Sequence, residues 1–347
     1  MNKGFNISDT IMQDFRLALI HDFWNAQEVV NDKTMVNDYR DLMKLPQAEQ
    51  TYILHIHAFF GRGDEDVIDF ICEHIMSQAR EINASWYFYE IIKSANENVH
   101  SETYARLLDY LAPNNKEKLL NAVGEYSFVR RKIEWCKKFM GRDIDRSVLC
   151  LMIVEQLFFS SSFCGIFWYK NVREILKGVS LANEMISRDE GLHYRAGLHV
   201  YKSLPKSMTE REVVAFVREA VEIEQEFVNI ITPDTVGMSK KLMCQYVEFM
   251  ADNIIADIGF PRIYNSANPF GFMAQFGIEK KVDNFHRKNT GYTAFVMEPY
   301  NPIKMIFNTI PLTREQVREN KGIADKELPL FTKEDVSLGS VLDNHLN

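Results

Sequence analysis

Several features that mark other protein classes are missing from this chain of 347 residues. Its five cysteines are odd in number and include no Cys-x-x-Cys pair, which fits reduced thiols in a protein core. No Gly-rich phosphate loop occurs, so the chain is not expected to bind a nucleotide. The net charge of −8 argues against a nucleic-acid partner, because such a partner favours a basic surface.

Signals for export and for membrane insertion are also weak. The segment from Met1 to Asp9 lacks the apolar core of a signal peptide, so a cytoplasmic location is expected. One run, Leu149–Tyr169, is apolar on almost every face, as in a buried core helix or a membrane span. Glu155, Gln156 and three consecutive serines weaken the membrane interpretation, and no second apolar run of that length exists. We therefore predict a buried helix and no membrane association.

Glycine and proline are scarce inside the periodic stretches, and this scarcity predicts an all-α fold. From about residue 12 to 260 the apolar residues follow helical spacing, and no strand alternation stands out. Breaks between helices are expected at Pro113, Gly141, Pro205 and Pro233. Four of the ten prolines lie beyond residue 288 among polar residues, which predicts an extended tail. The expected organisation is a helical domain over 1–287 and a flexible tail over 288–347.

Two copies of Glu-x-x-His carry most of the functional information in this sequence. They are Glu97–His100 and Glu190–His193. Residues i and i+3 of a helix face the same way, so each copy directs a carboxylate and an imidazole to one point. Two such pairs, with one lone acid from each of two further helices, form the ligand set of the di-iron and dimanganese helical bundles.

Candidates for the two lone acids are Glu155 and Asp64. Glu155 lies within the apolar run, where an ionised carboxylate is costly unless it is paired or bound to a metal. A neutral buried glutamate or a membrane segment is the alternative explanation. Asp64 lies four residues after Phe60 and shares its inward face, whereas Asp66 is turned about 200° away. Asp66 stays open as the alternative, because two glycines just before Asp64 weaken the helix.

The segments around these residues resemble the small, radical-generating subunit of class I ribonucleotide reductase. The likeness runs over roughly residues 20–293 and includes Glu-x-x-His-Ser-x-x-Tyr and Arg-Asp-Glu-x-Leu-His blocks. The segments that carry it are His21–Val29, Glu97–Tyr104, Ser187–His193, Gln245–Phe249 and Asn268–Phe270. The resemblance implies an all-α, ferritin-like helical bundle with a dinuclear metal site in its core.

The resemblance also implies a role for each site residue. One metal would be held by Asp64, Glu97 and His100, and the other by Glu155, Glu190 and His193, with Glu97 and Glu190 as bridging ligands. Tyr104 matches the tyrosine that holds a stable radical, and its spacing of seven residues from Glu97 is two helical turns. An apolar pocket around that radical would be formed by Phe159, Phe163 and Ile186.

A route for an electron and a proton is implied next to the metal site. Asp189 matches the residue that joins a metal-bound histidine to a tryptophan, which gives the chain Trp24–Asp189–His100–metal. Tyr292 matches the tail tyrosine of the route to the partner subunit, and Tyr300 is its rival. The tail beyond Tyr292 is longer than in the family, and this is where the sequence departs from the family pattern.

The function implied is that of the small subunit of ribonucleoside-diphosphate reductase. A dinuclear centre, expected to be two iron ions per chain with manganese or a mixed pair as alternatives, would react with oxygen and oxidise Tyr104. The oxidising equivalent would pass to a large catalytic subunit bound through the C-terminal tail, and the chain would form a homodimer. The alternatives are another di-metal oxidase or oxygenase on the same bundle, and a non-catalytic metal-binding bundle or inactive paralogue.

Overall fold

The computed structural model describes residues 9–275 except residues 142 and 236. In this part of the chain the regular structure is helical, and the only β feature is an isolated bridge between Thr235 and Met238. The all-α prediction is therefore confirmed. Helices that lie outside the core site are α1 (Thr10–His21), α2 (Ala26–Val29), α3 (Asp38–Lys44), α5 (Met76–Ile82), α7 (Lys116–Val123), α8 (Ser127–Phe139), α12 (Glu210–Ile231), α13 (Lys240–Asp257) and the 3-10 helix η3 (Gly271–Gln275).

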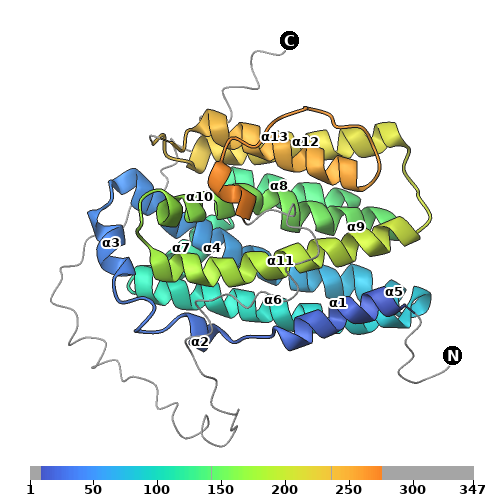
Figure 1. Ribbon diagram of the computed structural model, residues 1–347, viewed down its shortest axis with the longest axis horizontal. Helices are drawn as coiled ribbons and strands as arrows, with labels where there is room; N and C mark the ends of the chain where they lie inside the picture. The colour runs from blue at the N-terminus through green and yellow to red at the C-terminus, as the bar shows by residue number, and fades with distance from the viewer. Residues whose placement is uncertain (1–8, 142, 236, 276–347) are drawn as a thin grey trace, which may run out of the picture. The chain divides into compact units, whose positions relative to one another are not determined.

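Four long helical segments make the centre of the bundle. They are α4 (Gln47–Phe70), α6 (Ala84–Leu111), the continuous segment α9–η2–α10 (Ile144–Asn171) and α11 (Lys177–Ser203). In Figure 1 these segments run side by side in roughly one direction, with α12 and α13 on one side and α1 on the other. The centre of the bundle is therefore enclosed on several sides by other helices.

The helix boundaries follow from local chemistry. The side chain of Asn83 accepts hydrogen bonds from the backbone N–H groups of Ser85 and Trp86 and so begins α6. A capping box of Thr209 and Glu212 begins α12. The four breaks expected from Pro113, Gly141, Pro205 and Pro233 all fall between helices. Gly141 lies there with a φ of 71°, a conformation that glycine adopts without strain.

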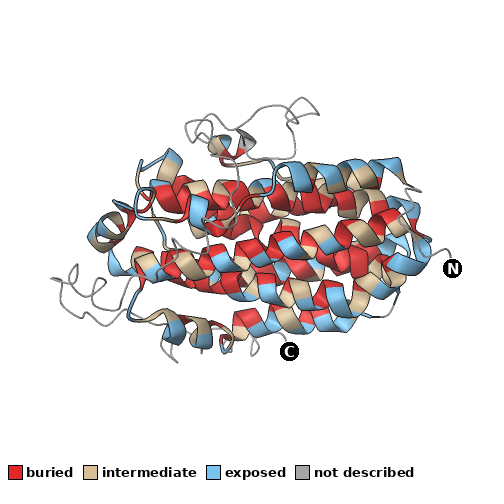
Figure 2. Cartoon of the chain, turned by 90° about the horizontal axis from the view of Figure 1, so that it is seen from below, coloured by how far each residue is buried: buried red, intermediate tan, exposed pale blue. Residues whose placement is uncertain are grey.

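The apolar run forms a core helix. The segment Ile144–Asn171 is long and apolar enough to cross a membrane, but 89% of its most apolar window is buried inside the protein. Figure 2 shows buried residues along the inner faces of the long helices and exposed residues along their outer faces. Such burial fits the core of a helical bundle.

Two π-helical turns interrupt the long helices, where the sequence suggests regular α-helix. They are η1 (Ile71–Ile75), which follows α4, and η2 (Val154–Phe158), which joins α9 to α10. A π turn has i→i+5 hydrogen bonds, and such turns are frequent at functional sites. The second turn contains Glu155, so the irregular turn carries one of the expected metal ligands.

Tail residues named from the sequence lie outside the described residues. These are Tyr292 and Tyr300, together with the boundary expected at residue 287.

Candidate metal centre

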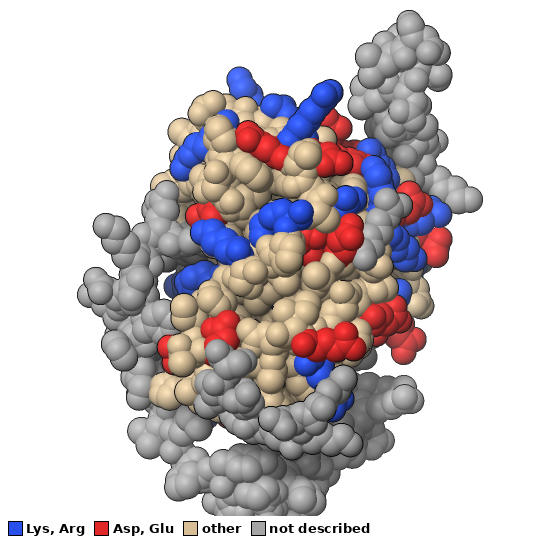
Figure 3. Space-filling model, turned by 90° about the vertical axis from the view of Figure 1, so that its right-hand side faces the viewer, with Lys and Arg blue, Asp and Glu red and all other residues tan. Residues whose placement is uncertain are grey.

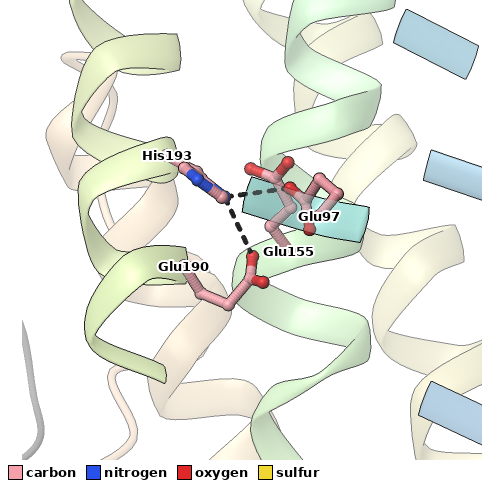
Figure 4. A group of neighbouring side chains, drawn as sticks. All are labelled: Glu97, Glu155, Glu190 and His193. Carbon is pink, nitrogen blue, oxygen red and sulfur yellow. Dashed lines mark ion pairs between the residues drawn. The ribbon is translucent and has the colours of Figure 1, made fainter. Parts of the chain in front are cut away.

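Four helical segments bring the six expected ligands together in the core. Asp64 comes from α4, Glu97 and His100 from α6, Glu155 from η2, and Glu190 and His193 from α11. All six are at most 3% exposed. Figure 4 shows Glu97, Glu155, Glu190 and His193 pointing toward one another from three helical segments. One ligand atom from each of these four residues lies within 4.8 Å of the others.

The two histidines face the same pair of glutamates. Nδ1 of His100 lies 3.1 Å from both Glu97 Oε2 and Glu190 Oε1. Nδ1 of His193 lies 2.9 Å from Glu97 Oε1 and 3.6 Å from Glu190 Oε2. Glu97 and Glu190 are therefore each in contact with both histidines, as ligands shared between two metal ions would be.

Unsatisfied polar atoms in the cluster show that it fits a metal. Six buried side-chain atoms of the cluster make no hydrogen bond: Asp64 Oδ2, Glu97 Oε1, Glu155 Oε1, both oxygens of Glu190, and His193 Nδ1. The close contacts that several of them make are ion-pair distances only. Buried polar groups without hydrogen bonds are costly and rare, and carboxylate and imidazole groups suit iron and manganese. The donor set therefore fits a dinuclear metal centre.

Asp64 and Asp66 differ sharply in their surroundings. Asp64 is buried, and its pKa is raised by burial and changed further by the charges of His100 and Glu97. The side chain of Asp66 is 41% exposed and lies 3.6 Å from Arg62. The structure therefore groups Asp64 with the cluster and leaves Asp66 beside a surface arginine.

Asp189 connects the cluster to Trp24. Its Oδ2 accepts hydrogen bonds from Trp24 Nε1 at 2.7 Å and from His100 Nε2 at 3.3 Å. Arg188 pairs with the other oxygen of Asp189 at 3.0 Å. Burial alone would raise the pKa of Asp189, but the hydrogen bond from His100 and the charge of Arg188 lower it to about 2. The contacts expected for Trp24–Asp189–His100 are present, while the transport of an electron along them stays a prediction.

Asn96 is a partner of the site that sequence reasoning missed. Its Nδ2 donates to Asp189 Oδ2 at 3.0 Å, so its Oδ1 is left to accept from His193 Nε2 at 3.0 Å. Each histidine thus uses Nε2 as a donor to a fixed partner, which leaves Nδ1 for the carboxylate cluster. This is the arrangement that orients metal-binding histidines in proteins. The only sequence signal for Asn96 is its position next to Glu97.

The acids and histidines of the cluster change one another's protonation. Burial opposes the charged forms of His100 and His193, but neighbouring acids raise the pKa of both. The hydrogen bond to Asp189 has the largest raising effect on His100, and the negative charge of Glu97 has the largest raising effect on His193. The pKa of His193 is raised to about 10. Burial opposes the charged form of Glu97 as well, and His193 and His100 nevertheless hold its pKa below the usual value. A metal that binds the Nδ1 atoms must therefore displace protons.

Tyr104 lies in a closed, mostly aromatic pocket. It has no exposed surface, and its ring stacks on Phe60 with ring centres 4.9 Å apart. Phe159 and Phe163 both pack on Phe60, so they form the layer behind it. Ile186 is buried on α11. Burial raises the pKa of Tyr104, and among charged groups Asp64 adds most to that rise.

Asn183 and His57 hold the phenol of Tyr104 and were not expected from the sequence. Nδ1 of His57 donates to the carbonyl of Ile53 at 2.6 Å, which leaves Nε2 as an acceptor. The amide nitrogen of Asn183 faces that Nε2 at 3.5 Å and donates to the carbonyl of Val179 at 2.9 Å. Oδ1 of Asn183 therefore accepts from the Tyr104 hydroxyl at 3.0 Å. Burial lowers the pKa of His57 to about 4, so this ring is neutral.

On the face drawn in Figure 3, no patch of a single charge stands out on the part of the surface that the structure describes. Lysine and arginine side chains lie among aspartate and glutamate side chains over that face. The described residues also include exposed ion pairs, such as Lys138 with Glu219 at 2.9 Å. Exposed pairs of this kind contribute little to stability.

Comparison with protein families gives one match that covers most of the chain. Residues 1–269 match the family "Ribonucleotide reductase, small chain". The sequence is 36% identical over 287 residues to a ribonucleoside-diphosphate reductase small chain of Arabidopsis thaliana, a match that covers 80% of this protein and 84% of the relative. It is 35% identical over 273 residues to the corresponding small chain of Trypanosoma brucei brucei, with coverage of 76% and 78%.

Solved structures give the same fold. A ribonucleotide reductase homodimer from Saccharomyces cerevisiae, Rnr4, matches with a TM-score of 0.71 and 24% identity, over 82% of this chain and 89% of that one. The dimanganese(II)-NrdF of Streptococcus sanguinis matches with a TM-score of 0.68 and 18% identity, over 80% and 100% of the two chains. These likenesses support the ferritin-like fold.

Proposed function

The chain belongs to the small-chain family of ribonucleotide reductase, and from this premise we propose that it generates a radical on Tyr104 and delivers it to a large catalytic subunit. The observation that carries this proposal is the buried cluster of four acids and two histidines beside a fully buried tyrosine. The family is one of oxidoreductases that contain a dinuclear metal centre. Retention of every expected ligand type argues for an active centre rather than a binding-only relative.

We propose that Asp64, Glu97 and His100 hold one metal ion, and that Glu155, Glu190 and His193 hold the other. A bound iron pair would supply the oxidising power by its reaction with oxygen, and manganese is the alternative metal. Asp189 and Asn96 keep the two Nδ1 atoms directed at the cluster through the hydrogen bonds that they accept from His100 and His193.

Oxidation of Tyr104 removes one electron and the phenolic proton. Asn183 Oδ1 accepts the hydroxyl hydrogen bond and fixes the ring, but an amide oxygen is too weak a base to keep the proton. The carboxylates of the cluster are stronger bases, and we assign the phenolic proton to Asp64, whose charge acts most strongly on Tyr104. The surrounding phenylalanine rings exclude water and reductants, which would preserve a phenoxyl radical.

Delivery to the large subunit would use Trp24 and Asp189 within the described residues, and Tyr292 in the tail. The hydrogen bond of 2.7 Å between Trp24 and Asp189 supports this route. A homodimer is the proposed assembly, in line with the homodimer described for the relative from Saccharomyces cerevisiae.

Tyr292→Phe should retain the stored radical but stop nucleotide reduction, and Tyr300→Phe serves as its control.

The test of radical generation is electron paramagnetic resonance of the iron-loaded chain after exposure to air. The wild type should give a tyrosyl doublet, and Tyr104→Phe should bind metal and consume oxygen without that doublet. Tyr89→Phe is the matched control, because Tyr89 is also buried and its pKa is also raised by burial and by cluster acids. A doublet that persists in Tyr104→Phe and disappears in Tyr89→Phe would move the radical to Tyr89. Absence of any tyrosyl signal in the loaded wild type would favour another di-metal oxidase.

A further inference from the structure

A lysine side chain reaches into the cluster of acids and histidines. Lys93 belongs to α6, lies four residues before Glu97 and is 2% exposed. Its Nζ is 2.5 Å from Oε1 of Glu155. A charged ammonium has no lone pair to give to a metal, so Lys93 is not a further ligand.

Lys93 forms a buried ion pair with Glu155, whose carboxylate is its closest partner. The acid Glu90 lines the same small cavity as Lys93 and Glu155. Glu90 is held separately by a hydrogen bond from Trp86 at 2.7 Å, so the direct ion-pair partner of Lys93 is Glu155. A fixed cation therefore faces one of the proposed metal ligands.

This cation acts on one half of the cluster more than on the other. Lys93 contacts Glu155, and a cavity of about 10 Å³ beside it is also lined by Glu90 and His193. Both Glu155 and His193 are proposed ligands of the same metal. The strongest charges that act on Asp64, in the other half, come from members of the cluster itself, namely His100, Glu97, Glu190 and His193. The two halves therefore differ in charge although their ligand types are alike.

From this geometry we propose that Lys93 is a built-in cation that weakens metal binding in the Glu155–Glu190–His193 half, so that two metal ions bind in a fixed order. The inference rests on the proposed dinuclear centre. Four carboxylates already balance the charge of two divalent ions, and Lys93 adds one positive charge beside the second half. A divalent ion there must share Glu155 with the ammonium, and charges at such short range interact strongly in a protein interior. The first ion therefore binds to Asp64, Glu97 and His100.

The experiment is a titration of the metal-free full-length chain with Mn²⁺, with bound metal counted by equilibrium dialysis and elemental analysis. The wild type should bind two ions per chain with two well-separated dissociation constants. Lys93→Met should lower the second dissociation constant by about tenfold or more and leave the first nearly unchanged, because the ammonium no longer repels the second ion. Lys93→Arg keeps the charge and should keep the separation.

Lys132 provides a matched control outside the cluster. It is 4% exposed, and its Nζ lies 2.5 Å from Oε2 of Glu224, as Lys93 lies from Glu155. Lys132→Met should lower the thermal stability of the metal-free chain and leave both manganese dissociation constants unchanged. If Lys93 has only a structural role, Lys93→Met will behave in the same way, and the proposal is wrong.

Removal of Lys93 leaves Glu155 without its cation, and this loss can prevent Lys93→Met from folding. Lys93→Gln is the second variant for that case. Its metal-free form should melt at a lower temperature than the wild type, while Mn²⁺ should raise its melting temperature by more than it raises that of the wild type. An equal or smaller rise would overturn the role of Lys93. If the wild type itself binds fewer than two ions, the dinuclear centre fails, and this outcome is distinct from two ions whose affinities do not respond to Lys93.

Discussion

Asp252 and Asp64 are two buried aspartates that the molecule treats in opposite ways. Asp252 has no exposed surface, and its Oδ1 accepts from the backbone N–H groups of Ile263 and Tyr264 at 2.7 and 2.8 Å. Its Oδ2 accepts from the N–H of Ser266 at 3.0 Å. Asp64 is 1% exposed, and its Oδ2 makes no hydrogen bond. The first carboxylate is satisfied by the fold that it stabilises, whereas the second is left for a ligand.

The same contrast extends to the neighbours of Asp64. Both oxygens of Glu190 and one oxygen of Glu97 make no hydrogen bond, and their close contacts are with the histidines of the cluster. A fold that only needed stability would not gather such groups in its core, because an unsatisfied buried polar group costs free energy of folding. Stability and function are therefore separated between two regions of the molecule, and this separation can be tested.

The largest effects are expected when the two aspartates are each replaced by asparagine. Asp252→Asn should lower the free energy of unfolding by about 3 kcal/mol, because an amide cannot accept three charge-assisted hydrogen bonds. It should still bind two metal ions per chain. Asp64→Asn should lose stoichiometric loading of two metals, while the metal-free chain stays as stable as the wild type or becomes more stable. Urea unfolding and metal analysis on both variants check this, and the opposite pattern would break the comparison.

A smaller effect is expected from the partner of His193. Asn96→Leu should weaken metal binding by about 10- to 100-fold, because His193 loses the acceptor that directs its Nδ1 at the cluster. Asn98 is an exposed asparagine on the same helix, so Asn98→Leu is the matched control and should bind metal as the wild type does. Mn²⁺ titration measures both. Equal affinities in the two variants would mean that the histidine is oriented by other contacts.

A gradual effect, spread over several pH units, is a pH dependence that only the metal-free chain should show. The pKa of His193 is raised from 6.5 to about 10 in the folded chain, so the stability that this shift contributes is present below pH 6.5 and lost as the pH rises toward 10. The loss is at most about 1.4 kcal/mol per pH unit for each extra proton held by the folded state. The metal-loaded chain should lack this slope, because a metal replaces that proton. Urea unfolding across this range checks both forms, and parallel slopes would contradict the assignment of His193.

Much of the fold and of the cluster follows from the sequence for clear reasons. Helical spacing and the scarcity of glycine and proline fix the all-α class, and proline or glycine marks four of the helix breaks. Within each Glu-x-x-His pair the carboxylate and the imidazole face the same way, because residues three apart share one helix face. Asp64, on the buried face of α4, follows from the same periodicity.

Other parts depend on contacts between distant segments, which one sequence does not encode locally. Asn183 lies 79 residues from Tyr104, and Asn96 lies 97 residues from His193. Lys93 resembles a surface lysine in the sequence, and its burial beside Glu155, 62 residues away, appears only in the folded chain. The π turn that carries Glu155 is also absent from the periodic pattern, since it differs from an α turn by one residue.

The most direct test of the dinuclear centre is anomalous X-ray scattering from crystals of the metal-loaded chain, recorded at the absorption edge of the metal. We predict two ions per chain, one bound by Asp64 and His100 and the other by Glu155 and His193, with Glu97 and Glu190 shared between them. A single ion, or ions bound away from these six side chains, would contradict it.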